Sequence, residues 1–230
     1  GKFLYRYQYP HADWVITPND SIARDFRKRW RVPAKKVLVL PNPVDVKWLR
    51  QRAGKGVRKP GIGLRFVASG RLVYQKGFDR LIKWLVEMPI DTHLTIFGTG
   101  PCNDVLRQRA EELLGIGRIT FAGFVENPWP TYAGADAFLL TSRWEGMSNA
   151  SLEALALGTP VIGTPQSGGL RELASQTVDS AVTLADPGKA FINTMAKTKP
   201  KVMGVLSASL LPELYTLESV TAKFEELLTS

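Results

Sequence analysis

The stretch AFLLTSRWEGMSNASLEALALGTPVIGT, residues 137–164, decides the fold of this 230-residue chain. It begins with an apolar run, passes through a polar loop into a short amphipathic segment, and ends in a second apolar run. Ser148 or Asn149 is a suitable N-cap and the Gly-Thr-Pro sequence at 158–160 a suitable stop, so we expect a helix over 149–157. A strand, a helix and a second strand in this order predict a parallel βαβ unit.

The same alternation runs from Gly61 towards the C-terminus. Further strand-like runs are LRFVASG (64–70), HLTIFGTG (93–100), RITFAGF (118–124) and AVTL (181–184). Further helix-like segments are GFDRLIKWLVEM (77–88), VLRQRAEELLG (105–115), GLRELA (169–174) and LPELYTLESVTAKFEELL (211–228). The predicted fold class is therefore α/β, a Rossmann-like parallel sheet with helices on both faces. The helical spacing also predicts these core residues: Phe78, Leu81, Leu85, Leu106, Leu113 and Leu114.

The region before Gly61 is different in composition. Residues 1–50 are expected to form a separate piece, with strands at 12–19 and 36–42 around a helix at 20–30 that is capped by Asp20 or Ser21. Residues 51–61, rich in Gly, Lys and Arg, are predicted to be an exposed linker, and residues 62–230 the Rossmann-like domain. The chain has no initiator Met, which favours a fragment of a longer protein.

Composition limits the class of protein. Apolar residues make up 44% of the chain, enough for a packed core, and a single cysteine, Cys102, allows no internal disulfide and favours a reducing compartment, the cytoplasm. The sequence has no run of the length that a membrane span requires. Of the net charge of +9, the excess lies in residues 1–60, which hold 15 Lys and Arg against 4 Asp and Glu. Residues 24–36 are therefore either a solvated face or a surface for an anionic membrane or lipid-linked substrate. Nucleic acid is not favoured, because the sequence shows no aromatic-interleaved basic motif of the RNA-binding type.

The carboxyl ends of the parallel strands are the place where such sheets bind ligands. Strands that end in glycine, as at Gly70 and Gly98, permit close approach of a ligand, although a tight turn alone also selects glycine. The start of the 149–157 helix would present free N–H groups to an anion. Glu145 and Glu153, separated by seven residues, could accept hydrogen bonds from hydroxyl groups on either side of that anion. The alternative is that Glu145 caps locally and Glu153 is solvated.

Two cations follow the first strand of the domain. Arg71 and Lys76 lie in GRLVYQKGF, residues 70–78, at the same predicted edge of the sheet. Together they could hold a diphosphate, the arginine through two parallel hydrogen bonds and the lysine as a point charge. The alternative is that both side chains are solvated.

Five motifs in order resemble a known family. GRLVYQKGFDRLI, FGTGP, ITFAGFV, SRWEGMSNASLEALALGTPVI and SGGLRE are similar to the donor-nucleotide domain of the family 4 retaining glycosyltransferases. The resemblance covers roughly residues 36–230 and includes the family's two glutamates with seven residues between them. It implies the GT-B fold, in which two Rossmann-like domains face a cleft, and it makes residues 1–45 the last elements of the acceptor domain and the crossover.

The resemblance also implies roles for individual residues. Arg71 and Lys76 would bind the donor diphosphate, Glu145 the hydroxyls of the transferred sugar, and Glu153 the ribose hydroxyls; Glu145, Arg71 and Lys76 would be the catalytic set. The remaining donor-binding residues would be Gly70, Gly98, the backbone near Met147, Ser148, Asn149 and Ala150, and, around the base, Phe124 and Val125. Met147-Ser148 replaces the Phe-Gly that often follows the first Glu-Gly in the family, which leaves the donor sugar open.

The function that follows from the resemblance is a hexosyl- or N-acetylhexosaminyltransferase. It would move a sugar from a nucleotide diphosphate sugar, a UDP-sugar, to a glycan or lipid-linked acceptor in surface polysaccharide biosynthesis, at the inner face of the membrane. With no Asp-X-Asp triplet in the sequence, we expect no metal or other cofactor, because Arg71 and Lys76 would stabilise the leaving group. The alternatives are a nucleotide-sugar-binding module that is inactive as an isolated chain, and a sugar-nucleotide epimerase. A glycoside hydrolase would leave Arg71 and Lys76 without a role.

Overall fold

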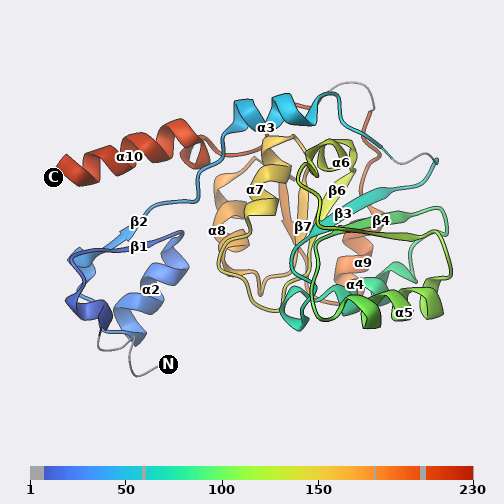
Figure 1. The fold of residues 1–230 in the computed structure, drawn as a ribbon, viewed down its shortest axis with the longest axis horizontal. Helices are drawn as coiled ribbons and strands as arrows, with labels where there is room; N and C mark the ends of the chain where they lie inside the picture. The colour runs from blue at the N-terminus through green and yellow to red at the C-terminus, as the bar shows by residue number, and fades with distance from the viewer. Residues whose placement is uncertain (1–7, 59–60, 179, 203–205, 230) are drawn as a thin grey trace.

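A computed structural model describes residues 8–58, 61–178, 180–202 and 206–229. Its centre is a six-stranded sheet with the order β5-β4-β3-β6-β7-β8, in which every neighbouring pair is parallel (Figure 1). The strands are β3 (Arg65–Ser69), β4 (His93–Phe97), β5 (Ile119–Gly123), β6 (Ala137–Leu140), β7 (Val161–Gly163) and β8 (Val182–Leu184). The prediction of a Rossmann-like parallel sheet is confirmed.

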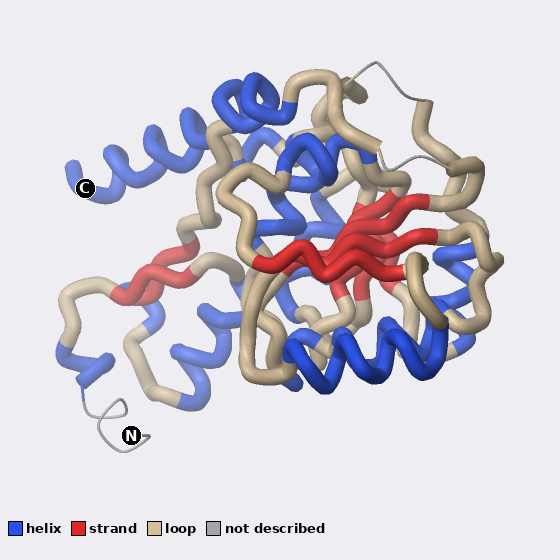
Figure 2. The backbone as a smooth tube through the Cα atoms, turned by 45° about the vertical axis from the view of Figure 1, so that its right-hand side comes forward, coloured by secondary structure: helices blue, strands red, loops and turns tan. Residues whose placement is uncertain are grey.

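Helices cover both faces of this sheet, as Figure 2 shows. One face carries α4 (Phe78–Leu85), α5 (Asn103–Leu114) and α9 (Lys189–Ala196). The other carries α3 (Val46–Ala53), α6 (Trp129–Gly134), α7 (Asn149–Ala156) and α8 (Gly168–Gln176). Successive residues of a strand point to opposite faces. Phe66 and Ala68 of β3 therefore pack under α4, while Val67 between them packs in the core on the other face.

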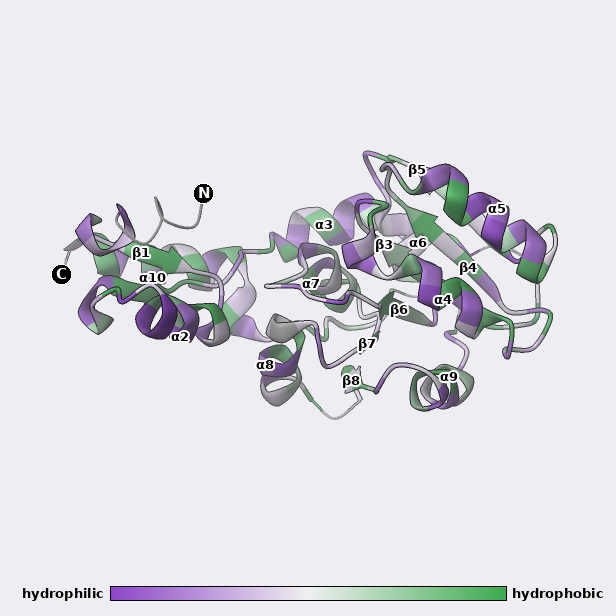
Figure 3. Cartoon of the chain, turned by 90° about the horizontal axis from the view of Figure 1, so that it is seen from below, coloured by the Kyte–Doolittle hydropathy of each residue, from purple (hydrophilic) through white to green (hydrophobic). Residues whose placement is uncertain are grey.

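The predicted core holds with one correction. Phe78, Leu81, Leu85 and Leu106 are buried, and Leu114 is half-buried against the same cluster. The prediction for Leu113 is wrong, because its side chain is 41% exposed. Residues 106, 110 and 114 follow one another at four-residue spacing along the buried face of α5, and residue 113 lies beside that stripe. Figure 3 shows apolar and polar positions alternating along this helix.

The predicted strands all form, but three helices were not predicted. These are α3, α6 and α9, each of eight residues or fewer. α6 begins in the Pro-Trp-Pro sequence at 128–130, because a proline in the first turn of a helix loses no hydrogen bond. The cap of α2 (Asp20–Arg29) is also a correction: it is Asn19, whose Oδ1 accepts a hydrogen bond from the N–H of Ile22 at 2.9 Å.

The N-terminal piece is a small βαβ unit of its own. Strands β1 (Val15–Thr17) and β2 (Val37–Val39) are parallel, and α2 packs on them around a separate core. The chain then crosses to α3, and it meets the C-terminal region at Val44, which exchanges backbone hydrogen bonds of 2.9 Å with Tyr215 and Leu217. From there α10 (Leu217–Thr229) extends towards the side of the N-terminal piece (Figure 1). The predicted boundary at residue 50 falls inside α3, and the domain limits stay a prediction.

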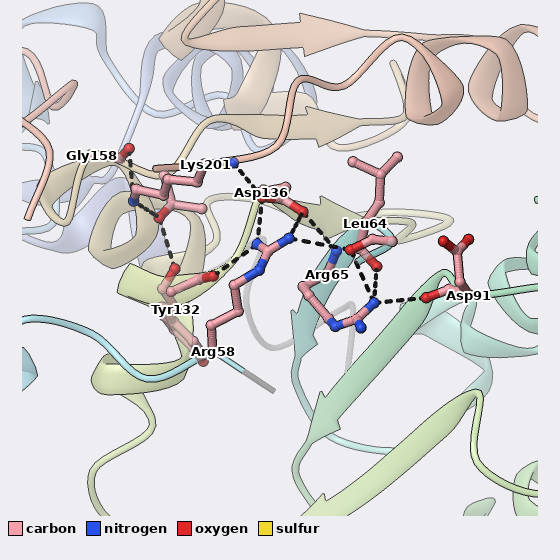
Figure 4. A network of polar contacts seen from close by, with 11 residues as sticks. Arg58, Leu64, Arg65, Asp91, Tyr132, Asp136, Gly158 and Lys201 are labelled. Carbon is pink, nitrogen blue, oxygen red and sulfur yellow. Dashed lines mark hydrogen bonds and ion pairs between the residues drawn. The ribbon is translucent and has the colours of Figure 1, made fainter. Parts of the chain in front are cut away.

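In the segment 51–61, of which Lys59 and Pro60 are not described, most residues are exposed, but Arg58 is held against the sheet; the linker stays a prediction. The Arg58 side chain is only 11% exposed and forms a two-pronged ion pair with the fully buried carboxylate of Asp136, at 2.6 and 3.0 Å. The same carboxylate accepts hydrogen bonds from the backbone N–H groups of Arg65 and Lys201, at 2.7 and 2.6 Å (Figure 4). A buried carboxylate requires such partners. Arg58 is one of them, so its ion pair with Asp136 holds this end of the segment against the sheet.

Candidate functional site

The order of the sheet reverses between β3 and β6, which are neighbours at its centre. The loops that follow these two strands leave the carboxyl edge side by side, where doubly wound sheets bind their ligands. Hydrogen bonds join the loops: the N–H of Arg143 donates to the Gln75 carbonyl at 2.7 Å, and the Gln75 amide donates to the Trp144 carbonyl at 2.8 Å. Arg143 also forms a two-pronged ion pair with Asp79 at the start of α4. The two loops are thus fixed relative to each other.

The loops bring Lys76 and Glu145 into contact. The Lys76 ammonium donates to Oε2 of Glu145, which also accepts a hydrogen bond from the Ser142 hydroxyl at 3.1 Å. Both side chains are mostly buried, with 18% and 14% exposed. Lys76 ends a short 3-10 helix (Tyr74–Lys76), after which Gly77 takes a left-handed conformation and starts α4. A cation and an acceptor from different loops therefore share one point at the switch in strand order.

The start of α7 lies at the same edge. Its N-cap is Ser148, one of the two predicted residues, and the Ser148 hydroxyl accepts from the N–H of Ser151 at 3.3 Å. The N–H groups of the first turn have no partner within a helix, and they carry its positive end. The cap follows Glu145, the partner of Lys76, by three residues, so both stand on the same loop at this edge. This combination favours an anion.

The N-terminal piece contacts this loop directly. Asn19 donates a hydrogen bond to the carbonyl of Gly146 at 2.8 Å, and Asn42 donates to the side-chain oxygen of Asn149 at 2.6 Å. The N–H of Asp20 also donates to the carboxylate of Glu172 on α8 at 3.0 Å. The first two contacts tie the loop after Glu145 and the start of α7 to the N-terminal piece, and the third ties that piece to α8.

The glycines at the strand ends have a structural explanation. A Cβ atom on Gly98 would lie 2.1 Å from the carbonyl oxygen of Gly70, which no side chain tolerates, and Gly98 has φ of +122°. A Cβ atom on Gly70 would lie 3.0 Å from Cε of Lys76, whose stem passes over this position. Close approach of one chain segment to another thus accounts for both glycines. Arg71, the next residue, is exposed at the same edge.

Glu153 lies about one turn inside α7 and is half-buried. Its Oε2 accepts a hydrogen bond from the indole Nε1 of Trp129 at 2.9 Å. Burial raises the pKa of Glu153 above its ordinary value of 4.5, and the indole hydrogen bond lowers it in part. Trp129 is not among the residues that the sequence indicated for the site. No local pattern reveals the pair, because 24 residues separate its members.

Apolar side chains adjoin the edge at the end of β5. Phe124 is 80% exposed and Val125 is 37% exposed, after Gly123 turns the chain with a φ of +71°. Met147, by contrast, is half-buried against the core under α7. The switch point therefore offers, along one edge, an exposed apolar surface, a carboxylate, a positive helix end with a lysine, and a second carboxylate. Such a row can bind an anion that carries hydroxylated groups on both sides and an aromatic group at one end.

A doubly wound sheet with this edge defines a Rossmann-like ligand-binding domain. Residues 55–197 match the family model described as glycosyl transferases group 1, and residues 1–48 match that of glycosyltransferase family 4. The chain therefore belongs to the group 1 glycosyl transferases, and the resemblance stated from the motifs is confirmed at the level of the family.

Two relatives illustrate the match. The chain is 30% identical over 174 residues to the N-acetylgalactosamine-N,N'-diacetylbacillosaminyl-diphospho-undecaprenol 4-alpha-N-acetylgalactosaminyltransferase of Campylobacter jejuni, covering 75% of this chain and 47% of the relative. It is 28% identical over 193 residues to the UDP-Gal:alpha-D-GlcNAc-diphosphoundecaprenol alpha-1,3-galactosyltransferase of Escherichia coli, covering 78% and 50%. The chain thus spans about half the length of these relatives.

Solved structures show the same fold. HepE of Anabaena, in complex with UDP and glucose, superposes with a TM-score of 0.79 at 19% identity, over 99% of this chain and 66% of that one. The pneumococcal O-GlcNAc transferase GtfA, in complex with UDP and GlcNAc, superposes with a TM-score of 0.72 at 17% identity, over 98% and 47%. The prediction that this chain holds the C-terminal, Rossmann-like half of a GT-B fold is thereby confirmed.

Proposed function

We propose that this chain is the donor-binding part of a glycosyltransferase that moves a sugar from a UDP-sugar to a glycan or lipid-linked acceptor. The observation that carries the proposal is the contact between Lys76 and Glu145 beside the start of α7. In a nucleotide sugar the anomeric carbon is bonded to the diphosphate. A cation for the phosphate and a carboxylate for the sugar hydroxyls must therefore be neighbours, as these two side chains are.

The remaining groups at the edge would bind the diphosphate, the ribose and the base of the donor in turn. The free N–H groups of α7 would bind phosphate oxygens, Glu153 the ribose hydroxyls, and the surface at Phe124 and Val125 the base. Arg71, exposed at the end of β3, would complete the diphosphate site. In this arrangement the donor runs along the carboxyl edge from β5 towards the switch point.

The chemistry proposed is stabilisation of a leaving group. As the bond from the sugar to the diphosphate breaks, negative charge grows on the phosphate oxygen, and Lys76, Arg71 and the α7 helix end would stabilise it more in the transition state than in the ground state. These cations would take the place of a metal ion. We further propose that the acceptor hydroxyl attacks on the face that the diphosphate leaves, with the departing phosphate as its base, which gives retention of configuration.

The comparisons support the choice of donor and acceptor. The Anabaena and pneumococcal structures are complexes with UDP, and the Escherichia coli relative is named for UDP-galactose and a diphosphoundecaprenol acceptor. A lipid-linked acceptor agrees with the basic stretch 24–36, although two of its cations serve the fold: Arg27 donates to the Val37 carbonyl and Lys36 to the Pro10 and Ala12 carbonyls. None of the helices in the described part of the chain is long and apolar enough to cross a membrane.

A second candidate is a donor-binding module that is inactive alone, which the span of half a relative's length favours. The two separate in an assay of sugar transfer, with this chain compared against a version extended by the acceptor domain of a relative. Binding of UDP without transfer by this chain, and transfer by the extended one, would support the module.

Titration calorimetry with UDP, GDP and ADP tests the donor site. Lys76→Ala removes a charge-assisted contact and leaves Glu145 to repel the diphosphate, so UDP affinity should fall by about 10- to 100-fold. The double variant Lys76→Ala/Glu145→Gln should recover part of the loss. Lys83→Ala, an exposed lysine of α4, is the matched control and should bind as wild type. If wild type binds none of the three diphosphates, the proposal is wrong.

A further inference from the structure

Trp129 is joined to the site by a hydrogen bond to Glu153, which no pattern in the neighbouring sequence predicts. Its indole Nε1 donates to Oε2 of Glu153 at 2.9 Å, from the first residue of α6 to the middle of α7. An indole N–H can only donate, and it does not titrate. One oxygen of the Glu153 carboxylate is therefore engaged in a fixed direction, which sets how the carboxylate faces the edge.

The indole itself is clamped by the crossover helix. Its ring packs edge-on to Trp48 of α3, with centroids 4.8 Å apart, and the guanidinium of Arg52 lies 5.2 Å from the centroid of Trp48 and 5.7 Å from that of Trp129. Backbone contacts fix the same region, because the N–H of Val57 donates to the carbonyl of Pro130 at 2.6 Å. The Trp48 ring, a cation and a backbone hydrogen bond leave the indole little freedom.

We propose that Trp129 is a positioning residue for the donor ribose: it orients the Glu153 carboxylate to accept the ribose hydroxyls, and the Trp48–Arg52 pair holds it in place. The inference rests on the proposed function. It explains why an indole follows the loop of Phe124 and Val125, since the ribose lies between the base and the diphosphate. α6 begins where that loop ends, so one segment would supply both the surface for the base and the support for the ribose ligand.

The electrostatics agree with this role. Burial raises the pKa of Glu153, and the indole hydrogen bond opposes that effect, so Trp129 helps to keep the carboxylate ionised. The guanidinium of Arg52 from α3 lies against the indole ring itself, 5.7 Å from its centroid. Burial raises the pKa of the Tyr132 hydroxyl on α6, and the nearby Glu153 charge raises it further, so this hydroxyl stays neutral.

The test compares ligands with and without ribose hydroxyls. Wild type should bind UDP more tightly than 2′,3′-dideoxyuridine diphosphate. Trp129→Phe keeps a ring and removes the N–H, so it should reduce this preference by about 3- to 10-fold, while affinity for inorganic pyrophosphate stays unchanged. The pH at which UDP affinity is lost on acidification should also move upward. In a Glu153→Ala background the substitution should no longer alter the preference.

The controls separate this role from simple packing. Trp84→Phe alters a buried tryptophan that packs on Phe191 below the opposite face of the sheet, and it should leave the preference as it is. If Trp129→Phe weakens UDP and its dideoxy analogue equally, or leaves both unchanged, the positioning role is refuted. Where Trp129→Phe does not fold, Arg52→Met loosens the clamp and should lower the preference in the same direction; an unchanged preference would likewise refute it. Wild type that binds neither UDP nor pyrophosphate would instead refute the proposed function.

Discussion

Asp136→Ala should destabilise this chain strongly, and the structure sets the size of the effect. The Asp136 side chain is completely buried, and its two oxygens accept four hydrogen bonds: two from the Arg58 guanidinium and one each from the backbone N–H groups of Arg65 and Lys201. Removing the carboxylate leaves the Arg58 charge, which is 11% exposed, without its ion-pair partner. Breaking a buried pair in this way costs about 3–5 kcal/mol.

For a chain of this size, such a loss corresponds to a melting temperature lower by about 6–20 °C. Urea unfolding followed by circular dichroism measures the free energy, and calorimetry the melting temperature. Asp25→Ala, an exposed aspartate of α2, is the matched control and should change the free energy of unfolding by less than about 0.5 kcal/mol. The double variant Arg58→Met/Asp136→Leu removes both charges and should be more stable than Asp136→Ala. A free energy for Asp136→Ala within about 1 kcal/mol of wild type would contradict the reasoning, because this is less than the cost expected for breaking such a pair.

Two further predictions concern charge. Because burial raises the pKa of Glu153, its ionised form costs stability as pH rises above the ordinary value of 4.5; Glu153→Gln, which still accepts from Trp129, should match wild type below pH 4.5 and exceed its free energy of unfolding at neutral pH. Urea titrations at each pH measure this, and an unchanged difference across the range would count against it. The basic stretch 24–36 should make the chain sediment with anionic vesicles more than with neutral ones, and Arg24→Glu/Lys28→Glu or added salt should abolish the difference. Equal sedimentation with both vesicles would exclude the membrane surface.

Local patterns in the sequence were sufficient for most of the fold. Alternating apolar runs and amphipathic segments predicted each strand of the main sheet, because strand and helix periodicities are set within a few residues. The same patterns failed where an element is short or its chemistry ambiguous. α6 was not predicted because it begins in a Pro-Trp-Pro sequence. Leu113 fits the helical spacing of a core residue, but the way α5 packs on the sheet leaves it exposed.

The sequence by itself determined the fold class, the family and the residues of the carboxyl edge, including Glu145, Glu153 and Lys76. Only the tertiary structure decided which of them touch. Lys76 meets Glu145 across 69 residues, Trp129 meets Glu153 across 24, and Arg58 meets Asp136 across 78. Such contacts depend on the order of the strands and on the burial of each charge. Neither of these properties produces a recognisable pattern in the neighbouring sequence. The physical reason is that periodicity indicates only which side of its own helix or strand a residue occupies. A hydrogen bond between distant segments depends on where the topology of the whole sheet places those segments.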